Sequence, residues 1–314
     1  MIGSDSDTRR PDGTRCSVHI VTKSFAPDAK FCDTLVASSE RFASPSIGHT
    51  LVVPRQDRAL FEHLVSSRTR LIFEDEVLPE VVRRVRRKVW FVGMTPVRSW
   101  VFQQIVKLSL ADAIDADVLV IVDSDSYFCR PFDESVFVDD RGRARLFANP
   151  GHPAIQPHQK WHRTTARLLG LPEQTWFGAD YVTHAAVWHR PTLARLTERI
   201  AAVTGRPWHR EVARSWNVSE YTLYGVFAQH VLPEGDREIF PTHEDLAHSS
   251  WSYDVRTPEG RAAFVEELEP HHIVIGIQSK EQLSAADRRR LVASFEAAQP
   301  ASSRRRPEPS PEAT

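Results

Sequence analysis

The sequence has little cysteine, no excess of charge of either sign and no long hydrophobic run. Only three of its 314 residues are cysteines, and no two of them have the C-x-x-C spacing. An odd number of cysteines without that spacing argues against a disulfide framework and against a zinc knuckle. We therefore expect a protein of a reducing compartment, most simply a cytoplasmic one.

The charges of the chain nearly cancel. It holds 40 Lys and Arg against 41 Asp and Glu, for a formal net charge of -1. Because nucleic-acid-binding proteins usually carry a basic field, we expect no nucleic-acid partner. No apolar run approaches the roughly 20 residues that cross a bilayer, so we expect no transmembrane segment. The polar N-terminus also lacks the apolar stretch of a signal peptide.

Composition divides the chain into two polar tails and two halves. Residues 1–15 and 299–314 are expected to be disordered because they are polar or rich in Pro, Ser and charge. Between them, residues 16–135 alternate strand-like and helix-like patterns, which predicts an α/β fold with a mostly parallel central sheet flanked by helices. The expected strands lie near 18–21, 49–55, 69–78 and 117–125, and the expected helices near 27–42, 57–65 and 99–114.

The other half, residues 136–298, is expected to complete the sheet and to form an aromatic-rich subdomain. Six of the eight tryptophans lie between residues 161 and 251. Open α/β sheets bind ligands outside the carboxyl ends of their strands. An aromatic-rich segment placed over those ends would form the second wall of a ligand cleft.

The helix predicted at 99–114 carries a polar stripe. Trp100, Gln103, Gln104 and Lys107 are spaced i, i+3, i+4 and i+7, so they share one helix face. Apolar residues occupy the opposite face. A helix that packs beside a central strand yet carries polar residues either faces solvent or turns this stripe toward a cleft.

Two aspartates follow the most apolar predicted strand, in the stretch "VLVIVDSDSYF". Asp123 and Asp125 would lie at the ligand-binding edge of the sheet, where like charges repel unless a cation lies between them. Carboxylate oxygens are good ligands for a divalent cation, and a bound cation can neutralise a diphosphate leaving group. The alternative interpretation is that the aspartates only cap the next turn.

Four stretches together resemble a known superfamily. They are "TKSFAPD", "SWVFQQIVKL", "ADVLVIVDSDSYFCRPFD" and "WNVSEYTLYGVF", and they resemble a GT-A-type glycosyltransferase, a nucleotide-diphospho-sugar transferase with a D-x-D motif after a central strand. Within that superfamily they are similar to a bacterial family of unknown function, over residues 16–280. The resemblance implies a GT-A-like fold and a nucleotide-diphosphate sugar donor.

The resemblance also implies where the donor and the metal bind. Mn²⁺ or Mg²⁺ would be held by Asp123 and Asp125. The remaining candidates for donor binding are Thr22, Lys23, Gln104, Lys107 and Ser124. Several GT-A families add a C-terminal histidine to the metal, and His248 resembles it, with His271 and His272 as rivals. A histidine ligand would favour Mn²⁺.

The second half of the chain supplies candidates for the acceptor side. Ser219 is a plausible helix N-cap, and Glu220 would follow at the first helical position. There Glu220 would act as a general base for an acceptor hydroxyl, or its negative charge would only stabilise the start of the helix. In a retaining enzyme the same carboxylate would stabilise an oxocarbenium-like species. The acceptor, a carbohydrate or another hydroxyl compound, would meet aromatic and imidazole side chains, for which the candidates are Trp161, His184, Tyr224 and Trp251.

Two other functions share the strand and D-x-D pattern. A haloacid-dehalogenase-like phosphatase uses the first Asp as a nucleophile in a DxDxT setting, but here Tyr127 stands at the Thr position. A non-catalytic sugar-nucleotide-binding protein would keep the ligand site without turnover. A nucleotidyltransferase is disfavoured because "TKSFAPD" after the first strand contains no glycine.

Overall fold

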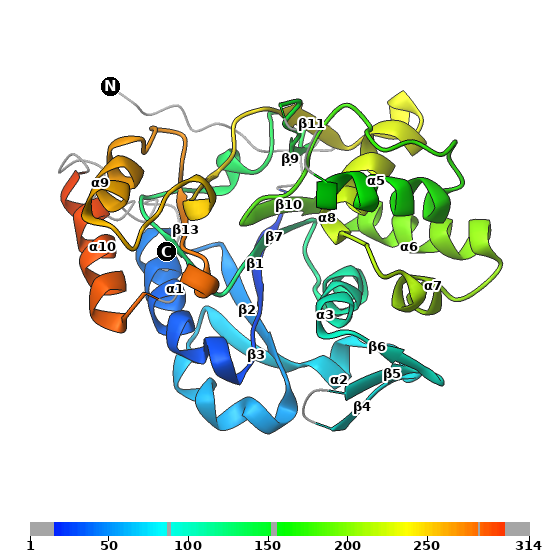
Figure 1. The fold of residues 1–314 in the computed structure, drawn as a ribbon, viewed down its shortest axis with the longest axis horizontal. Coiled ribbons are helices and arrows are strands. Elements are labelled where there is room, and N and C mark those ends of the chain that lie inside the picture. Colours follow the sequence, from blue (N-terminus) through cyan, green and yellow to red (C-terminus); the bar gives the residue numbers. More distant parts are fainter. Residues whose placement is uncertain (1–15, 87–88, 152–155, 282, 299–314) are drawn as a thin grey trace, which may run out of the picture.

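A five-stranded sheet runs through the middle of the computed structural model, which describes residues 16–86, 89–151, 156–281 and 283–298 (Figure 1). The strand order is β10-β7-β1-β2-β3, and only β10 runs antiparallel to its neighbour. The prediction of an α/β fold with a mostly parallel central sheet is therefore confirmed. Its strands are β1 (Val18–Lys23), β2 (Gly48–Val53), β3 (Thr69–Phe73), β7 (Val118–Val122) and β10 (Ala185–His189).

The strand β7 is central because it is apolar on both faces. All five of its residues are buried, as a strand needs when helices or other strands cover both sides of the sheet. It pairs in parallel with β1, with Val18 opposite Val118 and Val21 opposite Ile121. Since the two strands run the same way, their carboxyl ends, and with them Lys23 and Asp123, come to the same edge of the sheet.

Two amphipathic helices flank this sheet. Helix α1 (Ala29–Phe42) lies on one side of it and α3 (Ser99–Leu108) on the other (Figure 1). As predicted, α3 buries an apolar face, and in α1 Leu35 and Val36 point inward. Phe31 of α1 is only half-buried, and its ring is covered by the guanidinium of Arg288.

Three predicted elements differ from the observed ones. Residues 57–65 form two short 3-10 turns instead of a helix. The predicted strand 69–78 ends at Phe73, where α2 (Glu74–Val77) begins. The predicted helix 99–114 divides at Ser109 into α3 and α4 (Leu110–Ala113). In the last two cases only the element boundary was wrong, whereas at 57–65 the type of element was wrong and Leu60 and Val65 are exposed.

The remaining elements form small sheets and the helices of the second half. One small sheet has the order β4-β5-β6, another β12-β13-β8, and β11 pairs with β9. The strands are β4 (Val82–Arg86), β5 (Val89–Val92), β6 (Thr95–Val97), β8 (Ser126–Phe128), β9 (Ala144–Phe147), β11 (Ile239–Thr242), β12 (Ala247–Ser249) and β13 (Val274–Gly276). The helices are α5 (Gln156–Leu169), α6 (Arg190–Thr204), α7 (Trp208–Arg214), α8 (Glu220–Val226), α9 (Pro258–Glu266) and α10 (Ala285–Ala298).

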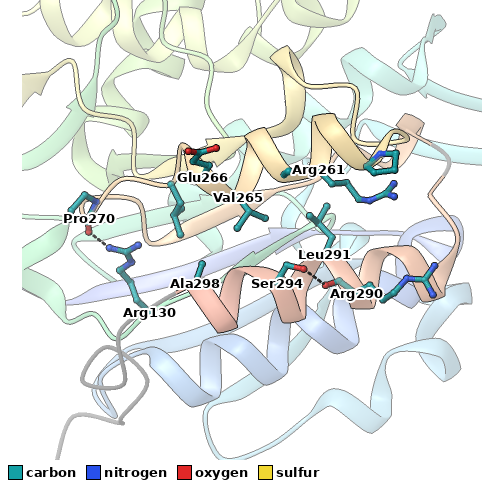
Figure 2. A pocket seen from close by; sticks show the side chains of 12 residues that line it. Arg130, Arg261, Val265, Glu266, Pro270, Arg290, Leu291, Ser294 and Ala298 are labelled. Atoms are coloured by element: carbon teal, nitrogen blue, oxygen red, sulfur yellow. Dashed lines mark hydrogen bonds between the residues drawn. The ribbon is translucent and has the colours of Figure 1, made fainter.

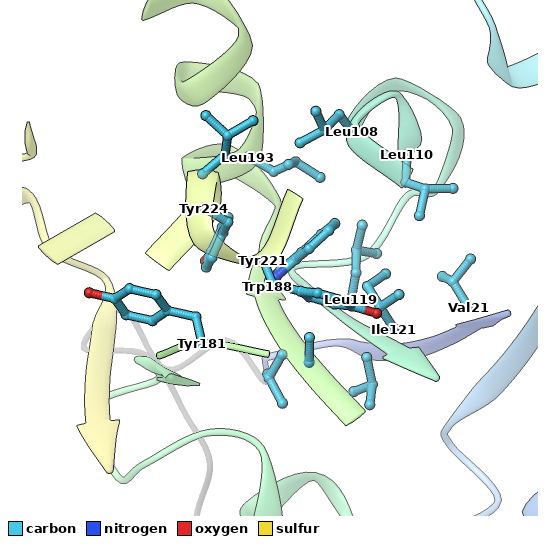
Figure 3. Close-up of a cluster of buried hydrophobic side chains, with 14 of the residues drawn as sticks. Val21, Leu108, Leu110, Leu119, Ile121, Tyr181, Trp188, Leu193, Tyr221 and Tyr224 are labelled. Carbon is cyan, nitrogen blue, oxygen red and sulfur yellow. The ribbon is translucent and has the colours of Figure 1, made fainter. Parts of the chain in front are cut away.

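One continuous apolar core contains residues from both halves of the chain. Figure 3 shows part of it, where Trp188 and Tyr224 pack near Leu108 and Leu119. The three cysteines are buried, and no disulfide joins them. Within the described part of the chain, no helix has the length and apolar character to cross a bilayer. The predicted tails, 1–15 and 299–314, lie outside the described residues, and the division near residue 135 stays a prediction.

Candidate functional site

A polar cavity of about 350 Å³ lies at the carboxyl ends of β1 and β7. β1 delivers Lys23 to it, and β7 runs directly into the two aspartates. The polar stripe of α3 and the start of α8 form other parts of the wall. Seven residues singled out in the sequence line this one cavity: Lys23, Gln104, Lys107, Asp123, Ser124, Asp125 and Glu220.

Lys107 connects the carboxylates of this cavity. Its buried Nζ lies 3.1 Å from Oδ1 of Asp123, 3.0 Å from Oε1 of Glu220 and 2.7 Å from Oη of Tyr221. The ammonium donates hydrogen bonds to Asp123 and Tyr221 and forms an ion pair with Glu220. Lys107 is therefore a residue that holds two carboxylates in place.

The charges of this group stabilise one another. Burial alone would lower the pKa of Lys107, but Asp123, Tyr221 and Glu220 outweigh it and hold that pKa well above its ordinary value. Burial would likewise raise the pKa of Asp123, and the Lys107 ammonium reverses this, so the pKa of Asp123 lies below its usual value. Lysine and aspartate are thus both ionised near neutral pH.

Asp125 is held by two groups from the far end of the chain. The backbone N–H of Ser279 donates to its Oδ2 at 2.7 Å, and the guanidinium of Arg288 donates to its backbone carbonyl. Asp28, at the start of α1, faces the same cavity. Burial, and after it the charge of Asp125, raises the pKa of Asp28 to about 6. The carboxylates of this cavity therefore repel one another.

Two side chains of the cavity have buried polar atoms that lack a hydrogen-bond partner among the described residues. They are the amide Oε1 and Nε2 of Gln104, and Oε2 of Glu220. Both residues are almost completely buried, and both line the cavity. Since an unsatisfied buried polar atom costs on the order of 1–3 kcal/mol, such atoms mark places where a ligand would donate or accept hydrogen bonds.

Glu220 is placed by the local sequence, as predicted. Oγ of Ser219 accepts the N–H of Thr222 at 3.3 Å, so Ser219 is the N-cap and α8 begins with Glu220. The first turn of the helix then directs this carboxylate toward Lys107. The same turn brings Tyr221 to the cavity.

The lining is more negative than positive. Its ionisable residues are two lysines and four carboxylates, namely Lys23, Lys107, Asp28, Asp123, Asp125 and Glu220. Lys23 is itself 3.5 Å from Glu74. An anionic ligand would be repelled by this lining unless a cation accompanied it. Among the described residues, no group of three or more His, Cys, Asp and Glu side chains is arranged to hold a metal ion.

Three predicted site residues lie away from the cavity, in the core. Oγ1 of the fully buried Thr22 is 3.0 Å from Nε2 of His49. His248 stacks on Phe264, and its Nε2 lies 2.7 Å from that residue's carbonyl oxygen. The hydroxyl of Tyr224 accepts a backbone N–H, and its ring stacks on a tryptophan. Each polar atom thus has a structural partner inside the protein.

The other predicted acceptor residues surround the cavity without lining it. The His184 carbonyl accepts the Asp123 N–H at 3.4 Å, and the His184 ring lies 4.8 Å from the ring of Trp251. Trp161 stacks on Trp100, which does line the cavity, at 6.4 Å. His271 and His272, the rival metal ligands, line a different cavity.

Sequence reasoning left six lining residues out of the predicted site: Phe25, Asp28, Trp100, Gln103, Tyr221 and Ser279. Trp100 and Gln103 belonged to the recognised polar stripe, and Asp28 to the quoted stretch "TKSFAPD", so a local signal existed for these three. Ser279 contributes a backbone N–H from more than 150 residues away. No local pattern predicts that contact.

A larger cavity, of about 820 Å³, lies between α9 and α10 (Figure 2). Arg261, Val265 and Leu291 line it, and Arg130 reaches across to donate to the carbonyl of Pro270. No residue predicted to be functional lines this cavity. Its size therefore does not make it the better candidate, since the charged side chains with unusual pKa values converge at the smaller one.

The comparisons with known proteins agree with the family suggested by the sequence but add no activity. A search of the curated proteins finds no match to this chain. A family model described as "Family of unknown function (DUF6492)" matches residues 17–298. This match covers nearly all of the chain between the two tails, including every lining residue of the polar cavity. The chain therefore belongs to the DUF6492 family.

Proposed function

We propose that the protein is a metal-dependent glycosyltransferase of the GT-A type, which moves a sugar from a nucleotide-diphosphate sugar to a hydroxyl acceptor. One observation carries the proposal. Asp123 and Asp125 follow the central strand into a cavity that also gathers Lys23, Gln104 and Glu220. Open α/β sheets bind their ligands outside the carboxyl ends of their strands, and both aspartates lie there.

The cavity fits a divalent cation that arrives with a diphosphate. Asp123 and Asp125 offer the hard oxygen ligands that Mn²⁺ and Mg²⁺ accept, and phosphate oxygens would complete the coordination. The excess negative charge of the lining supports this, because a diphosphate alone would be repelled. When bound, the cation would supply positive charge to the departing diphosphate.

The protein's own residues would orient the reactants. Gln104 would hydrogen-bond the donor through its unpartnered amide, and Ser124 lies between the two aspartates at the same wall. In the transfer, the acceptor oxygen forms a bond to the anomeric carbon. The bond between that carbon and the phosphate oxygen breaks, and the nucleoside diphosphate leaves with the electron pair.

Glu220 would receive the proton of the acceptor hydroxyl. Its Oε1 is held by Lys107, whereas Oε2 has no hydrogen-bond partner among the described residues and can accept one from a hydroxyl. A carboxylate positioned in this way serves as a general base. If the transfer retains configuration, the same carboxylate would stabilise an oxocarbenium-like species instead.

Turnover of the donor tests this proposal directly. Purified protein with Mn²⁺ should slowly hydrolyse one member of a panel of UDP-, GDP- and TDP-sugars, measured as released nucleoside diphosphate. Asp125→Asn should abolish the release. Asp115→Asn is the matched control, because Asp115 is fully exposed near the opposite end of β7 and should tolerate the change.

Other results would favour the other functions. Hydrolysis of a generic phosphate ester, combined with no response to any nucleotide sugar, would support the haloacid-dehalogenase-like phosphatase. Donor binding without any release of nucleoside diphosphate, in the presence of varied acceptors, would support the non-catalytic sugar-nucleotide-binding protein. Either result would overturn the transferase.

A further inference from the structure

A second cavity, of about 680 Å³, is formed in the aromatic-rich half of the chain. The end of β9, the start of α5 and the segment around β12 build its walls, and they contribute Phe147, His158 and Ser249. It shares no lining residue with the polar cavity at Asp123 and Asp125. Its chemistry is also different.

The lining of the second cavity disfavours anionic ligands. Its acidic side chains are Asp180, Glu244, Asp245 and Glu269, and no Lys or Arg of the described residues belongs to its lining. Three of these acids have ion-pair partners: Asp180 with His158, Glu244 with Arg145 from outside the lining, and Glu269 with His271. A phosphate, a nucleotide or an anionic lipid headgroup would meet unfavourable charge here.

The cavity combines an exposed indole with hydrogen-bond acceptors. Trp251 lines it and is 45% exposed, which is unusual for so large an apolar side chain. Asp245 accepts from the hydroxyl of Thr183 at 2.6 Å, and its burial raises its pKa to about 7. An aromatic face beside hydrogen-bond acceptors, one of which is the Asp245 carboxyl with its raised pKa, suits a neutral ring that bears many hydroxyls.

His184 joins this cavity to the aspartates. Its Nδ1 lies 2.7 Å from Oγ of Ser249, which lines the second cavity, and its ring lies beside Trp251. Its carbonyl oxygen accepts the N–H of Asp123. The ring fits there because Gly276 has no side chain, since a Cβ at that position would come within 2.4 Å of it.

A second contact joins the same two cavities through aromatic rings. Trp100 lines the polar cavity and stacks on Trp161 with an interplanar angle of 20°. Trp161 in turn stacks on His158, whose ring lies 4.4 Å away and lines the second cavity. The two cavities are therefore neighbours, separated by one layer of side chains.

We propose that the second cavity is the acceptor subsite and that it binds a neutral carbohydrate, with a sugar ring against Trp251 and hydroxyls donated to Asp180 and Asp245. This inference rests on the proposed transferase function, which it deepens by naming the class of acceptor. A carbohydrate bound there would lie behind the side chains of His184 and Trp161, and its reacting hydroxyl would extend past them to the cavity that Asp123 and Glu220 line.

Binding of glycans without any donor tests the proposal. The full-length protein is screened against an array of neutral, anionic and amine-bearing oligosaccharides, and the best neutral compound is measured by calorimetry. The wild type should bind a neutral oligosaccharide. Trp251→Ala should weaken that binding by about tenfold or more, because the stacking surface is lost, and Trp251→Phe should keep most of it.

Trp216→Ala is the matched control. Trp216 is a 70% exposed tryptophan that packs on Arg98 and lines neither cavity, so its removal should leave glycan affinity unchanged. Melting temperatures of all three variants show whether each one is folded. The change in melting temperature of the same samples on addition of nucleotide sugars and Mn²⁺ shows separately whether the donor site binds its ligand.

Each outcome decides between the two claims. The acceptor subsite is overturned if no neutral oligosaccharide binds, if only amine-bearing or anionic ones bind, or if Trp216→Ala weakens binding as much as Trp251→Ala does. In those cases an intact response to nucleotide sugars would leave the transferase itself standing. Glycan binding without any response to nucleotide sugars would instead remove the donor site and, with it, the role of the cavity as an acceptor subsite.

Discussion

Lys107 is the residue on which the charge balance of the polar cavity depends. Its ammonium lies between Asp123 and Glu220, which come from segments almost 100 residues apart in the chain. The ammonium group is desolvated, and that cost is offset by its two hydrogen bonds, to Asp123 and Tyr221, and by its ion pair with Glu220. The same arrangement fixes the position of the carboxylate proposed as the general base.

Removal of this ammonium should destabilise the fold. In Lys107→Met the two carboxylates lose their common counter-charge, and we expect the free energy of unfolding to fall by about 3 kcal/mol. Urea denaturation measures it, with the exposed Lys160→Met as the control. Adding Asp123→Asn should recover part of the loss, because one uncompensated charge disappears. Equal stability of Lys107→Met and wild type would contradict this account of the network.

Replacement of the proposed base should separate binding from chemistry. Glu220→Gln keeps the size of the side chain but removes its capacity to take a proton. We expect donor affinity close to that of the wild type and a release of nucleoside diphosphate lowered by roughly 100-fold or more. The exposed Glu198→Gln on α6 is the control. Transfer that persists in Glu220→Gln would take this residue out of the mechanism.

At the scale of elements, local spacing predicted the site where one element supplied several residues. The 3.6-residue period of a helix was enough to predict that Gln103, Gln104 and Lys107 share one face, and this face does line the cavity. Tyr224 was predicted to contact the acceptor, but Tyr221 lies only three residues before it on α8, and tertiary packing alone decides which of the two reaches the cavity. Tyr224 stacks on Trp188 in the core, while Tyr221 faces Lys107.

The position of α8 depends on a close contact that the sequence hides. A Cβ on Gly225 would come within 2.1 Å of the ring of Tyr181, so a side chain at this position would force the helix away. Helix propensity favours alanine over glycine by about 1 kcal/mol. We nevertheless expect Gly225→Ala to destabilise the protein by about 1–3 kcal/mol through overpacking, measured by thermal denaturation. A stabilised variant would show that propensity outweighs packing here.

At the scale of the whole molecule, the parallel sheet was predictable and its long-range contacts were not. Apolar strands that alternate with helices predict a mostly parallel sheet. They do not predict that β10 joins this sheet beside β7, from nearly 70 residues further along the chain. Ser279 reaches Asp125 across an even longer separation. His248 was predicted as a metal ligand by analogy, whereas the structure places it in the core against Phe264.

The fold should lose stability as the pH falls from about 6.5. His49 is buried between Ser39 and Thr22, and burial lowers its pKa to about 3, so the folded state keeps it neutral. The unfolded state binds a proton to this residue below pH 6.5, and therefore the free energy of unfolding rises with pH across this window. Stability is fully present above 6.5 and decreases progressively toward pH 3.

A variant isolates this effect of pH. His49→Gln cannot bind the proton, so the slope of stability against pH should be shallower by up to about 1.4 kcal/mol per pH unit between pH 4 and 6. The melting temperature across that range measures it. The exposed His63→Gln should leave the slope unchanged. An unchanged slope in His49→Gln would mean that other groups dominate the acid sensitivity.

The most direct test of the central claim is nucleotide binding with and without a metal. Melting temperatures are recorded with UDP, GDP and TDP, each in Mn²⁺ and then in excess chelator. We expect one nucleotide to stabilise the wild type only with Mn²⁺, by about 2.7 kcal/mol at one hundred times its dissociation constant. Asp125→Asn should lose the response. Nucleotide stabilisation that survives both the chelator and Asp125→Asn would contradict a metal held by the two aspartates.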